Sequence, residues 1–238
     1  MLNICYNLII KMKADMMIIN NLTVENISNA NEDFLNNFFK IINEIDSKLV
    51  NIINSKNLKI ILADKISDVH TSDKDKQSFK NDLEKYEEFT VENSDELSHG
   101  LCSDTINALC IFSNTTKIPY IASFLYHEIG HYIDYYVNWG NENIAPCLSS
   151  KKEFMEAYKN DIAKYWDKIK NDNRLRLKHY IEDSTPEKLS ITGLSETFAF
   201  CFARNNNKIE DVDIISDYFQ ETLSIAKKIT DEYLINLH

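Results

Sequence analysis

Apolar residues recur every three or four positions in several long stretches of the chain. The longest covers about residues 31 to 54, and similar patterns cover residues 120 to 137, 150 to 170 and 210 to 235. Apolar side chains at this spacing share one face of a helix, so each stretch predicts an amphipathic helix packed on a core. Ser150 and Glu153 form a capping-box pattern, which predicts the start of the third helix.

Shorter apolar runs have the length of strands. Leu58 to Ala63 and Ile106 to Ser113 are bounded by polar residues, and a further strand is expected over Met16 to Leu22. Residues 71 to 100 are polar and charged, which is typical of a loop with at most one short helix. The order of helix, strand, strand and then helices predicts a helix-rich α+β fold.

Composition limits the classes of protein that the chain can belong to. Its 238 residues fit one domain or a tight pair of subdomains, and only four Gly and three Pro favour long helices over a β-sandwich. A formal charge of −11 argues against a nucleic-acid partner. No run of about 20 apolar residues predicts a membrane span. The five cysteines are odd in number and form no C-x-x-C, so no disulfide framework is expected.

The first residues do not resemble a secretory signal. Met1 to Ile10 is mildly apolar, but the positive charges of Lys11 and Lys13 follow it instead of preceding it. We therefore expect residues 1–28 to be a leader, weakly ordered or an edge strand, and residues 29–238 to be a single folded domain. The site of action is expected to be the cytoplasm of the producing cell, or a place reached by a route that the sequence does not reveal.

The candidate chemistry lies in the predicted helix over residues 120 to 137. His127, Glu128 and His131 form an H-E-x-x-H motif. Residues four apart lie on the same helix face, so both imidazoles can reach one metal ion. Glu128 lies beside them, where it can act as a general base on a water molecule. Gly130, inside the same motif, indicates either a close approach of substrate or backbone, or tight packing against another helix.

A strand just before such a helix can serve substrate binding. The run Ile106 to Ser113 directly precedes the motif helix. We expect this strand to form the lip of a cleft and to pair with an extended peptide, in preference to being an ordinary buried strand.

A catalytic zinc ion usually has three protein ligands, so a third must follow the motif. The candidates are His179, Glu182, Asp183, Glu187, Glu196 and Glu210. Glu196 is favoured, because it opens an apolar segment where a lone carboxylate is costly unless paired or bound to a metal. Glu196 exposed in a first helical turn is the alternative reading. His179, in a basic stretch that otherwise suggests a solvated helix face, is the leading rival ligand.

Two segments resemble the active site of a known family. Leu125 to Tyr136 and Leu194 to Ala203 are similar to the two halves of the site in anthrax lethal factor and the clostridial Pro-Pro endopeptidases, which are gluzincins. The resemblance implies a zincin-like catalytic domain with a small mixed sheet and Zn²⁺ as cofactor. It makes His127, His131 and Glu196 the ligands, Glu128 the base and Asp134 a supporting residue.

The chain departs from the family pattern in three places. Leu189 stands where relatives have a tyrosine that stabilises the oxyanion, and Tyr180 could replace it only if the loop is rearranged. Phe200 stands where relatives have a carboxylate. The segment between His131 and Glu196 is longer by roughly two dozen residues. None of these departures removes a ligand or the base.

The predicted function is zinc-dependent hydrolysis of peptide bonds in an extended protein or peptide substrate. The resemblance suggests a toxin-like or proline-directed use, and an intracellular peptidase acting on one regulatory protein is an alternative use. A second hypothesis, from another class, is a zincin scaffold that has lost turnover and docks a partner protein.

Overall fold

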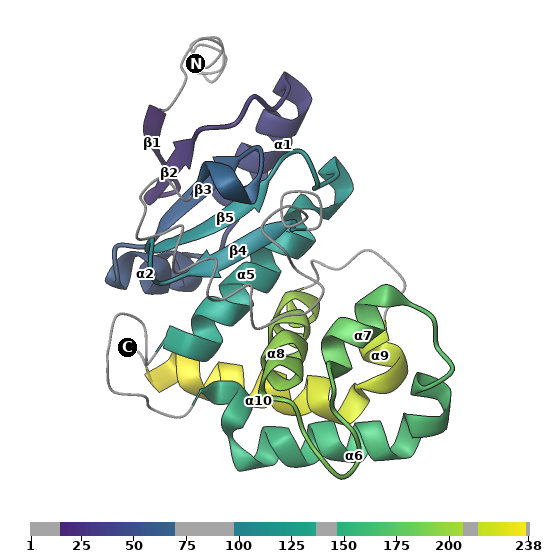
Figure 1. The fold of residues 1–238 in the computed structure, drawn as a ribbon. Coiled ribbons are helices and arrows are strands. Elements are labelled where there is room, and N and C mark those ends of the chain that lie inside the picture. Colours follow the sequence, from purple (N-terminus) through teal and green to yellow (C-terminus); the bar gives the residue numbers. More distant parts are fainter. Residues whose placement is uncertain (1–14, 70–97, 137–146, 207–213, 237–238) are drawn as a thin grey trace. The chain divides into compact units, whose positions relative to one another are not determined.

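The computed structural model describes residues 15–69, 98–136, 147–206 and 214–236 of the protein, which form an α+β fold (Figure 1). The chain divides into two compact units, Met1–Leu125 and Tyr126–His238, with the boundary inside helix α5 (Ile121–Tyr135). All described strands lie in the first unit, and the second is helical. The expected leader over residues 1–14 and most of the loop expected at 71 to 100 lie outside the described residues.

A mixed five-stranded sheet forms the centre of the first unit. Its strands run in the order β1-β2-β3-β5-β4. Their bounds are β1 Asp15–Ile19, β2 Leu22–Asn26, β3 Lys59–Ala63, β4 Gly100–Ser103 and β5 Ala108–Phe112. β2, β3 and β5 are parallel, and the end strands β1 and β4 pair antiparallel to their neighbours. The small mixed sheet is therefore confirmed, as is the strand expected from Leu58 to Ala63.

The prediction of one strand over Met16 to Leu22 is wrong, because this segment is part of a hairpin. Asn20 and Asn21 have φ values of 51° and 61°, and they connect β1 to β2. A two-residue hairpin loop with two positive φ values suits asparagine. Asn20 also donates through Nδ2 to the carbonyls of Ile42 and Ile45. Within the expected leader, β1 is an edge strand and β2 is an inner one.

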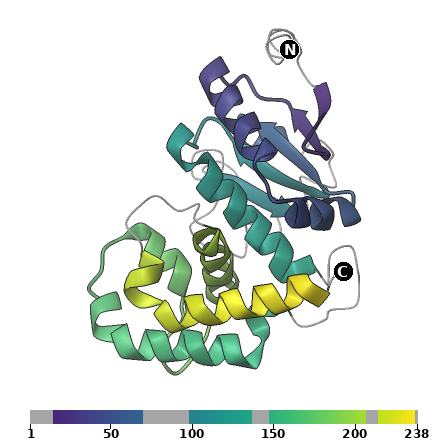
Figure 2. The same cartoon turned by 180° about the vertical axis from the view of Figure 1, so that it is seen from behind.

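The helix expected over residues 31 to 54 is two helices, α1 (Glu32–Asn43) and α2 (Ser47–Ser55). The apolar pattern continues across the break, but Asp46 starts a new helix by accepting a hydrogen bond from the Lys48 N–H. Figure 2 shows both helices in front of the sheet, on one of its faces. The fully buried Phe38, Ile42 and Ile53 come from this pair of helices.

The strand expected to bind substrate is an inner strand. β5 is hydrogen-bonded to β3 on one side and to β4 on the other, and all five of its residues are buried. Its backbone groups are thus already used within the sheet, and pairing of β5 with a peptide is excluded. An apolar cluster of Ile61, Ala63, Ala108, Cys110 and Phe112 accounts for its burial on one face.

The second unit consists of the end of α5 and further helices. These are α6 (Lys152–Ile169), α7 (Leu175–Ile181), α8 (Ile191–Asn205), α9 (Ile214–Tyr218) and α10 (Gln220–Asn236). α10 packs along α6 and α8, as Figures 1 and 2 both show. The helix expected over 210 to 235 is thus two helices, in its described part.

The predicted capping box at Ser150 is wrong. Ser150 ends a short 3₁₀ turn, η5 (Leu148–Ser150), and its hydroxyl donates to the carbonyl of Cys147. Lys151 is the N-cap residue of α6, without a side-chain cap. The hydroxyl is satisfied within the preceding turn, so it does not cap the helix.

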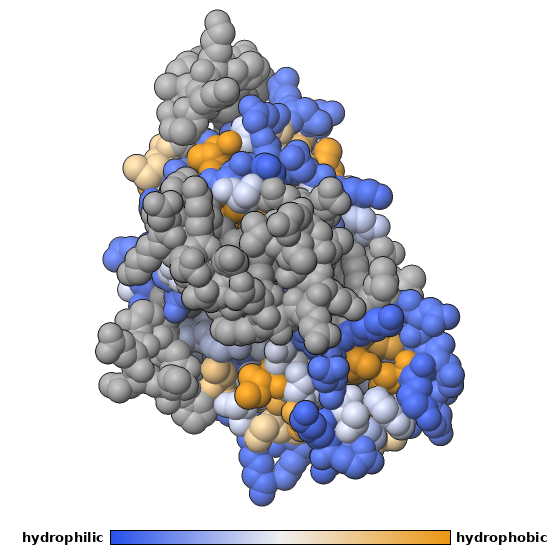
Figure 3. Space-filling view, in the orientation of Figure 1, coloured by the Kyte–Doolittle hydropathy of each residue, from blue (hydrophilic) through white to orange (hydrophobic). Residues whose placement is uncertain are grey.

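No helix among the described residues is long and apolar enough to cross a bilayer. On the face in Figure 3, the described surface is mostly hydrophilic, and apolar residues appear as separate spots.

Candidate metal centre

Helix α5 brings the two motif histidines together. His127 and His131 lie one turn apart, and their Nε2 atoms are 3.0 Å from each other. Both residues belong to the second unit, and His127 is 7 % exposed. Two ring nitrogens that point at each other in a buried place need a shared proton or a shared cation between them.

Helix α8 passes close to α5 at Gly130. A Cβ atom on Gly130 would lie 2.7 Å from the Cα of Ala199 and 2.8 Å from its carbonyl oxygen. Only glycine permits this approach, because backbone atoms cannot move aside as a flexible side chain can. Of the two explanations for Gly130, tight packing against a neighbouring helix is therefore the one observed.

The close approach of α8 places Glu196 beside both histidines. Its Oε2 lies 3.3 Å from His127 Nε2, and its Oε1 lies 3.4 Å from His131 Nε2. Glu196 is the sixth residue of α8, so it is not in the first turn, and its side chain is 25 % exposed. The alternative of an exposed carboxylate at the helix start is thus not what the structure shows.

The three side chains have the spacing of a metal-binding group. Their ligand atoms all lie within 4.8 Å of one another, and among the described residues this is the one such group of three or more. Ligands at 2.0–2.2 Å from a tetrahedral ion are about 3.3–3.6 Å apart. The two carboxylate–imidazole distances fall in this range, and the imidazole–imidazole distance is slightly shorter. The donor set therefore fits a small divalent cation.

The site has strongly perturbed ionisation. The positive charge of His131 and hydrogen bonds from both histidines outweigh burial and hold the pKa of Glu196 well below its usual value. Burial lowers the pKa of His131, but the charge and hydrogen bond of Glu196, together with the charges of Glu128 and Asp134, outweigh burial and raise that pKa to about 9. Burial raises the pKa of Glu128 to about 8, with His131 opposing and Glu196 reinforcing the shift. A bound cation would lower the pKa of each of these groups.

Asp134 is connected to His131 through the hydroxyl of Ser195. It is completely buried, and its Oδ1 accepts a hydrogen bond of 2.7 Å from the backbone N–H of Ser149. Its Oδ2 accepts one of 3.2 Å from the hydroxyl of Ser195. The same hydroxyl is 3.3 Å from His131 Nδ1. Burial raises the pKa of Asp134, and the hydrogen bonds from Ser149 and the charge of His131 oppose that rise.

The aromatic ring of Phe200 packs against His127. Phe200 lies with its ring centroid 4.0 Å from that of His127, and the Tyr180 ring is 4.2 Å from Phe200. Phe200, at a position where the resemblance led us to expect a carboxylate, thus makes an apolar contact with the candidate ligand His127. Tyr180 is buried behind Phe200, and Leu189 lies in the loop before α8.

The other candidate ligands do not join this group. Glu182, Asp183 and Glu187 are described and lie outside it. The side chain of His179 and all of Glu210 lie outside the described residues.

Sequence reasoning missed Ser195, Ser149 and the ring contact of Phe200. Ser195 carried a signal, since a hydroxyl in an apolar segment directly before a candidate ligand needs a partner. The backbone N–H of Ser149 carried no signal that the sequence could reveal.

The sequence matches no protein-family model, and no curated protein matches it significantly.

Proposed function

We propose that the protein is a zinc-dependent endopeptidase whose metal is held by His127, His131 and Glu196. The observation that carries the proposal is the convergence of two imidazole nitrogens and one carboxylate from helices far apart in sequence. Two histidines and a glutamate are a ligand set of catalytic zinc sites, which leave a fourth position open for water or substrate. The resemblance to gluzincins and the zincin-like character of the domain belong to the same proposal.

Glu128 provides the base in this mechanism. It directly follows a ligand in α5 and is 7 % exposed, so its proton affinity is set by its surroundings more than by bulk water. A zinc ion would supply Lewis acidity, lowering the pKa of a water molecule and polarising the scissile carbonyl. Glu128 takes up the proton of the attacking water and delivers it to the leaving amine. The substrate is a protein or peptide bound in extended form.

The direct test uses the purified chain and a library of peptides, with and without a zinc chelator. Cleavage that the chelator stops and zinc restores supports the proposal. Glu128→Gln keeps the shape of the side chain and removes the base, so it should retain zinc and lose roughly 10²–10⁴-fold in rate. Glu187→Gln, a change to an exposed carboxylate outside the ligand group, is the matched control. Full activity in Glu128→Gln would refute the role of the base.

A second candidate is a zincin scaffold that binds a partner protein without turnover. It is favoured by Leu189 in the expected tyrosine position and by the burial of Tyr180 behind Phe200. Zinc binding with no cleavage of any library peptide by the unchanged protein would select this candidate.

A further inference from the structure

We infer that Ser195 is a positioning residue that connects Asp134 to His131 and selects the metal-binding tautomer of this histidine. The inference rests on the metal site of the proposed function. Its basis is a continuous chain of contacts from the Ser149 N–H through Asp134 and Ser195 to His131 Nδ1.

The direction of the hydrogen bonds follows from what each group can donate. The backbone N–H of Ser149 can only donate, so Asp134 Oδ1 must accept. An ionised carboxylate only accepts, so the single hydroxyl proton of Ser195 points to Asp134 Oδ2. The Ser195 oxygen is then left with lone pairs facing His131 Nδ1, which must carry a proton and donate.

The tautomer decides whether His131 can bind a metal through Nε2. A proton on Nδ1 leaves the Nε2 lone pair free, and Nε2 is the atom that faces His127 and Glu196. Ligating histidines usually receive this support directly from a carboxylate or a carbonyl. Here the hydroxyl of Ser195 lies between the Asp134 carboxylate and His131. Ser195 also directly precedes the proposed ligand Glu196 in the sequence. One turn of α8 therefore supplies both a ligand and the support for another ligand.

Burial protects the hydrogen bonds that connect Asp134 and Ser195 to His131. Asp134 is 0 % and Ser195 is 4 % exposed, so water cannot easily replace either partner. A change to either residue should therefore alter zinc affinity, although neither contacts the ion.

The test measures zinc affinity of the full chain by competition with a chromophoric chelator. Ser195→Ala should weaken zinc binding roughly 10–100-fold, the range typical of a ligand's supporting partners. Ser195→Thr keeps the hydroxyl and should recover most of the affinity. Ser184→Ala is the matched control, because it removes another buried serine, hydrogen-bonded to Tyr158 and to the Ser190 N–H, away from the ligands. It should lower stability and leave zinc affinity unchanged.

Asp134→Asn tests the direction of the hydrogen bonds between Asp134, Ser195 and His131. The oxygen of the introduced amide must accept from the Ser149 N–H, so its NH₂ group donates to Ser195 and turns the serine proton toward His131 Nδ1. This reverses the tautomer, and zinc affinity should fall at least as far as in Ser195→Ala. Adding Ser195→Ala to Asp134→Asn removes the reversed donor, so the two losses should not add.

A spectroscopic readout separates positioning from general damage. In the zinc-loaded protein the His131 Nδ1 proton should be protected from exchange, and Ser195→Ala should make it exchange faster without changing the His127 signals. Unchanged zinc affinity in Ser195→Ala, additive losses in the double variant, or an unprotected Nδ1 proton in the unchanged protein would each overturn the inference. If the unchanged protein binds no zinc, the proposed function fails and the inference with it. Zinc binding without peptide cleavage leaves the inference standing.

Discussion

The two units place their polar side chains differently. Of the described polar or charged residues that are buried, only Thr116 and Ser123 belong to the first unit, while ten belong to the second. In the first unit Asp64 is partly exposed, and it accepts hydrogen bonds from the N–H and Nδ2 of Asn29 and from the hydroxyl of Ser113. In the second unit His127, Glu128 and Asp134 lie inside the helical packing.

The difference shows which unit carries the energetic cost of buried polar groups. Burying polar groups is unfavourable unless they are fully hydrogen-bonded or bound to a cation. The first unit avoids this cost with an apolar sheet. In the second unit, buried His127, Glu128 and Asp134 lie at the candidate metal site, where changes should affect metal binding and stability together. Other buried polar residues of this unit, such as Asp161 and Ser184, lie outside the candidate ligand group, and changes to them should affect stability alone. The first three predictions below compare the two units, and the fourth compares two ion pairs within the second unit.

The largest effect is expected from Glu196→Ala. Removing a ligand should weaken zinc binding by more than the 10–100-fold typical of a supporting partner. Zinc content measured after dialysis checks the result, with Glu25→Ala of the first unit's Lys59–Glu25 ion pair as control. Zinc content unchanged by Glu196→Ala would move the third ligand to His179 or elsewhere.

Gly130→Ala should come next. The new Cβ would meet backbone atoms of Ala199, so α5 and α8 must separate. We expect a loss of about 3 kcal/mol in the free energy of unfolding, at the upper end for overpacking. This exceeds the roughly 1 kcal/mol that alanine gains by helix propensity. Zinc affinity should fall as well. Ala108→Val overpacks β5 in the first unit and should lower stability without changing zinc affinity.

A pair of aspartate changes compares a buried aspartate in the second unit with a partly exposed one in the first. Asp161 is 2 % exposed, and its Oδ2 accepts from both the N–H and the hydroxyl of buried Thr222. Asp161→Ala should cost about 2 kcal/mol, because two donors lose their acceptor away from water. Asp64→Ala in the first unit should cost about 1 kcal/mol, since water can replace the carboxylate. Chemical denaturation measures both, and equal losses would contradict the contrast between the units.

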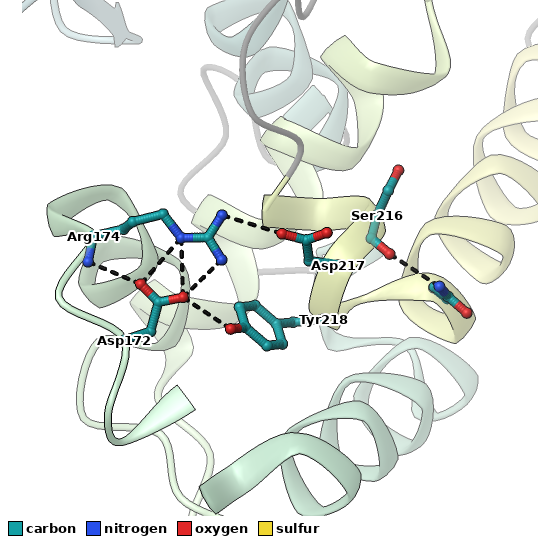
Figure 4. A network of polar contacts seen from close by, with 6 residues as sticks. Asp172, Arg174, Ser216, Asp217 and Tyr218 are labelled. Carbon is teal, nitrogen blue, oxygen red and sulfur yellow. Dashed lines mark hydrogen bonds and ion pairs between the residues drawn. The ribbon is translucent and has the colours of Figure 1, made fainter. Parts of the chain in front are cut away.

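The smallest effect concerns Asp172 and its pH dependence. Figure 4 shows Asp172 between Arg174 and Tyr218, with Arg174 also reaching Asp217. Hydrogen bonds from Arg174 hold the pKa of Asp172 well below its usual value. A carboxyl with a lowered folded-state pKa stabilises the fold above its unfolded pKa of about 3.9, and the effect disappears as pH falls through the folded value.

Asp172→Asn should therefore lower stability by about 1 kcal/mol near neutral pH. The difference from the unchanged protein should shrink as the pH falls below about 4. Thermal unfolding at several pH values measures it. Asp167→Asn, which removes an exposed ion pair with Lys170, should change the Tm less at every pH. If the stability difference between Asp172→Asn and the unchanged protein grew toward acid pH, the pKa of Asp172 would be raised in the folded protein instead of lowered.

Periodicity predicted elements well where the apolar pattern and the hydrogen bonding end together. The motif helix α5 and strand β3 lie where the sequence placed them. The pattern failed at residues 44–46, because apolar spacing continues where the backbone breaks and Asp46 caps a second helix. It also failed at Asn20 and Asn21, whose positive φ values turn the chain inside an expected strand.

The candidate site also has features that the sequence determined and features that only packing determined. The i, i+4 spacing of His127 and His131 is a property of one helix, so the sequence alone determined that both imidazoles share a face. The position of Glu196 depended on packing, because Gly130 lets α8 approach where any larger residue would not. Which hydrogen bonds support His131 was decided only by the tertiary structure, since Ser195 lies 64 residues further along the chain. Local spacing acts through the geometry of a single helix, whereas contacts between distant segments depend on how whole helices pack.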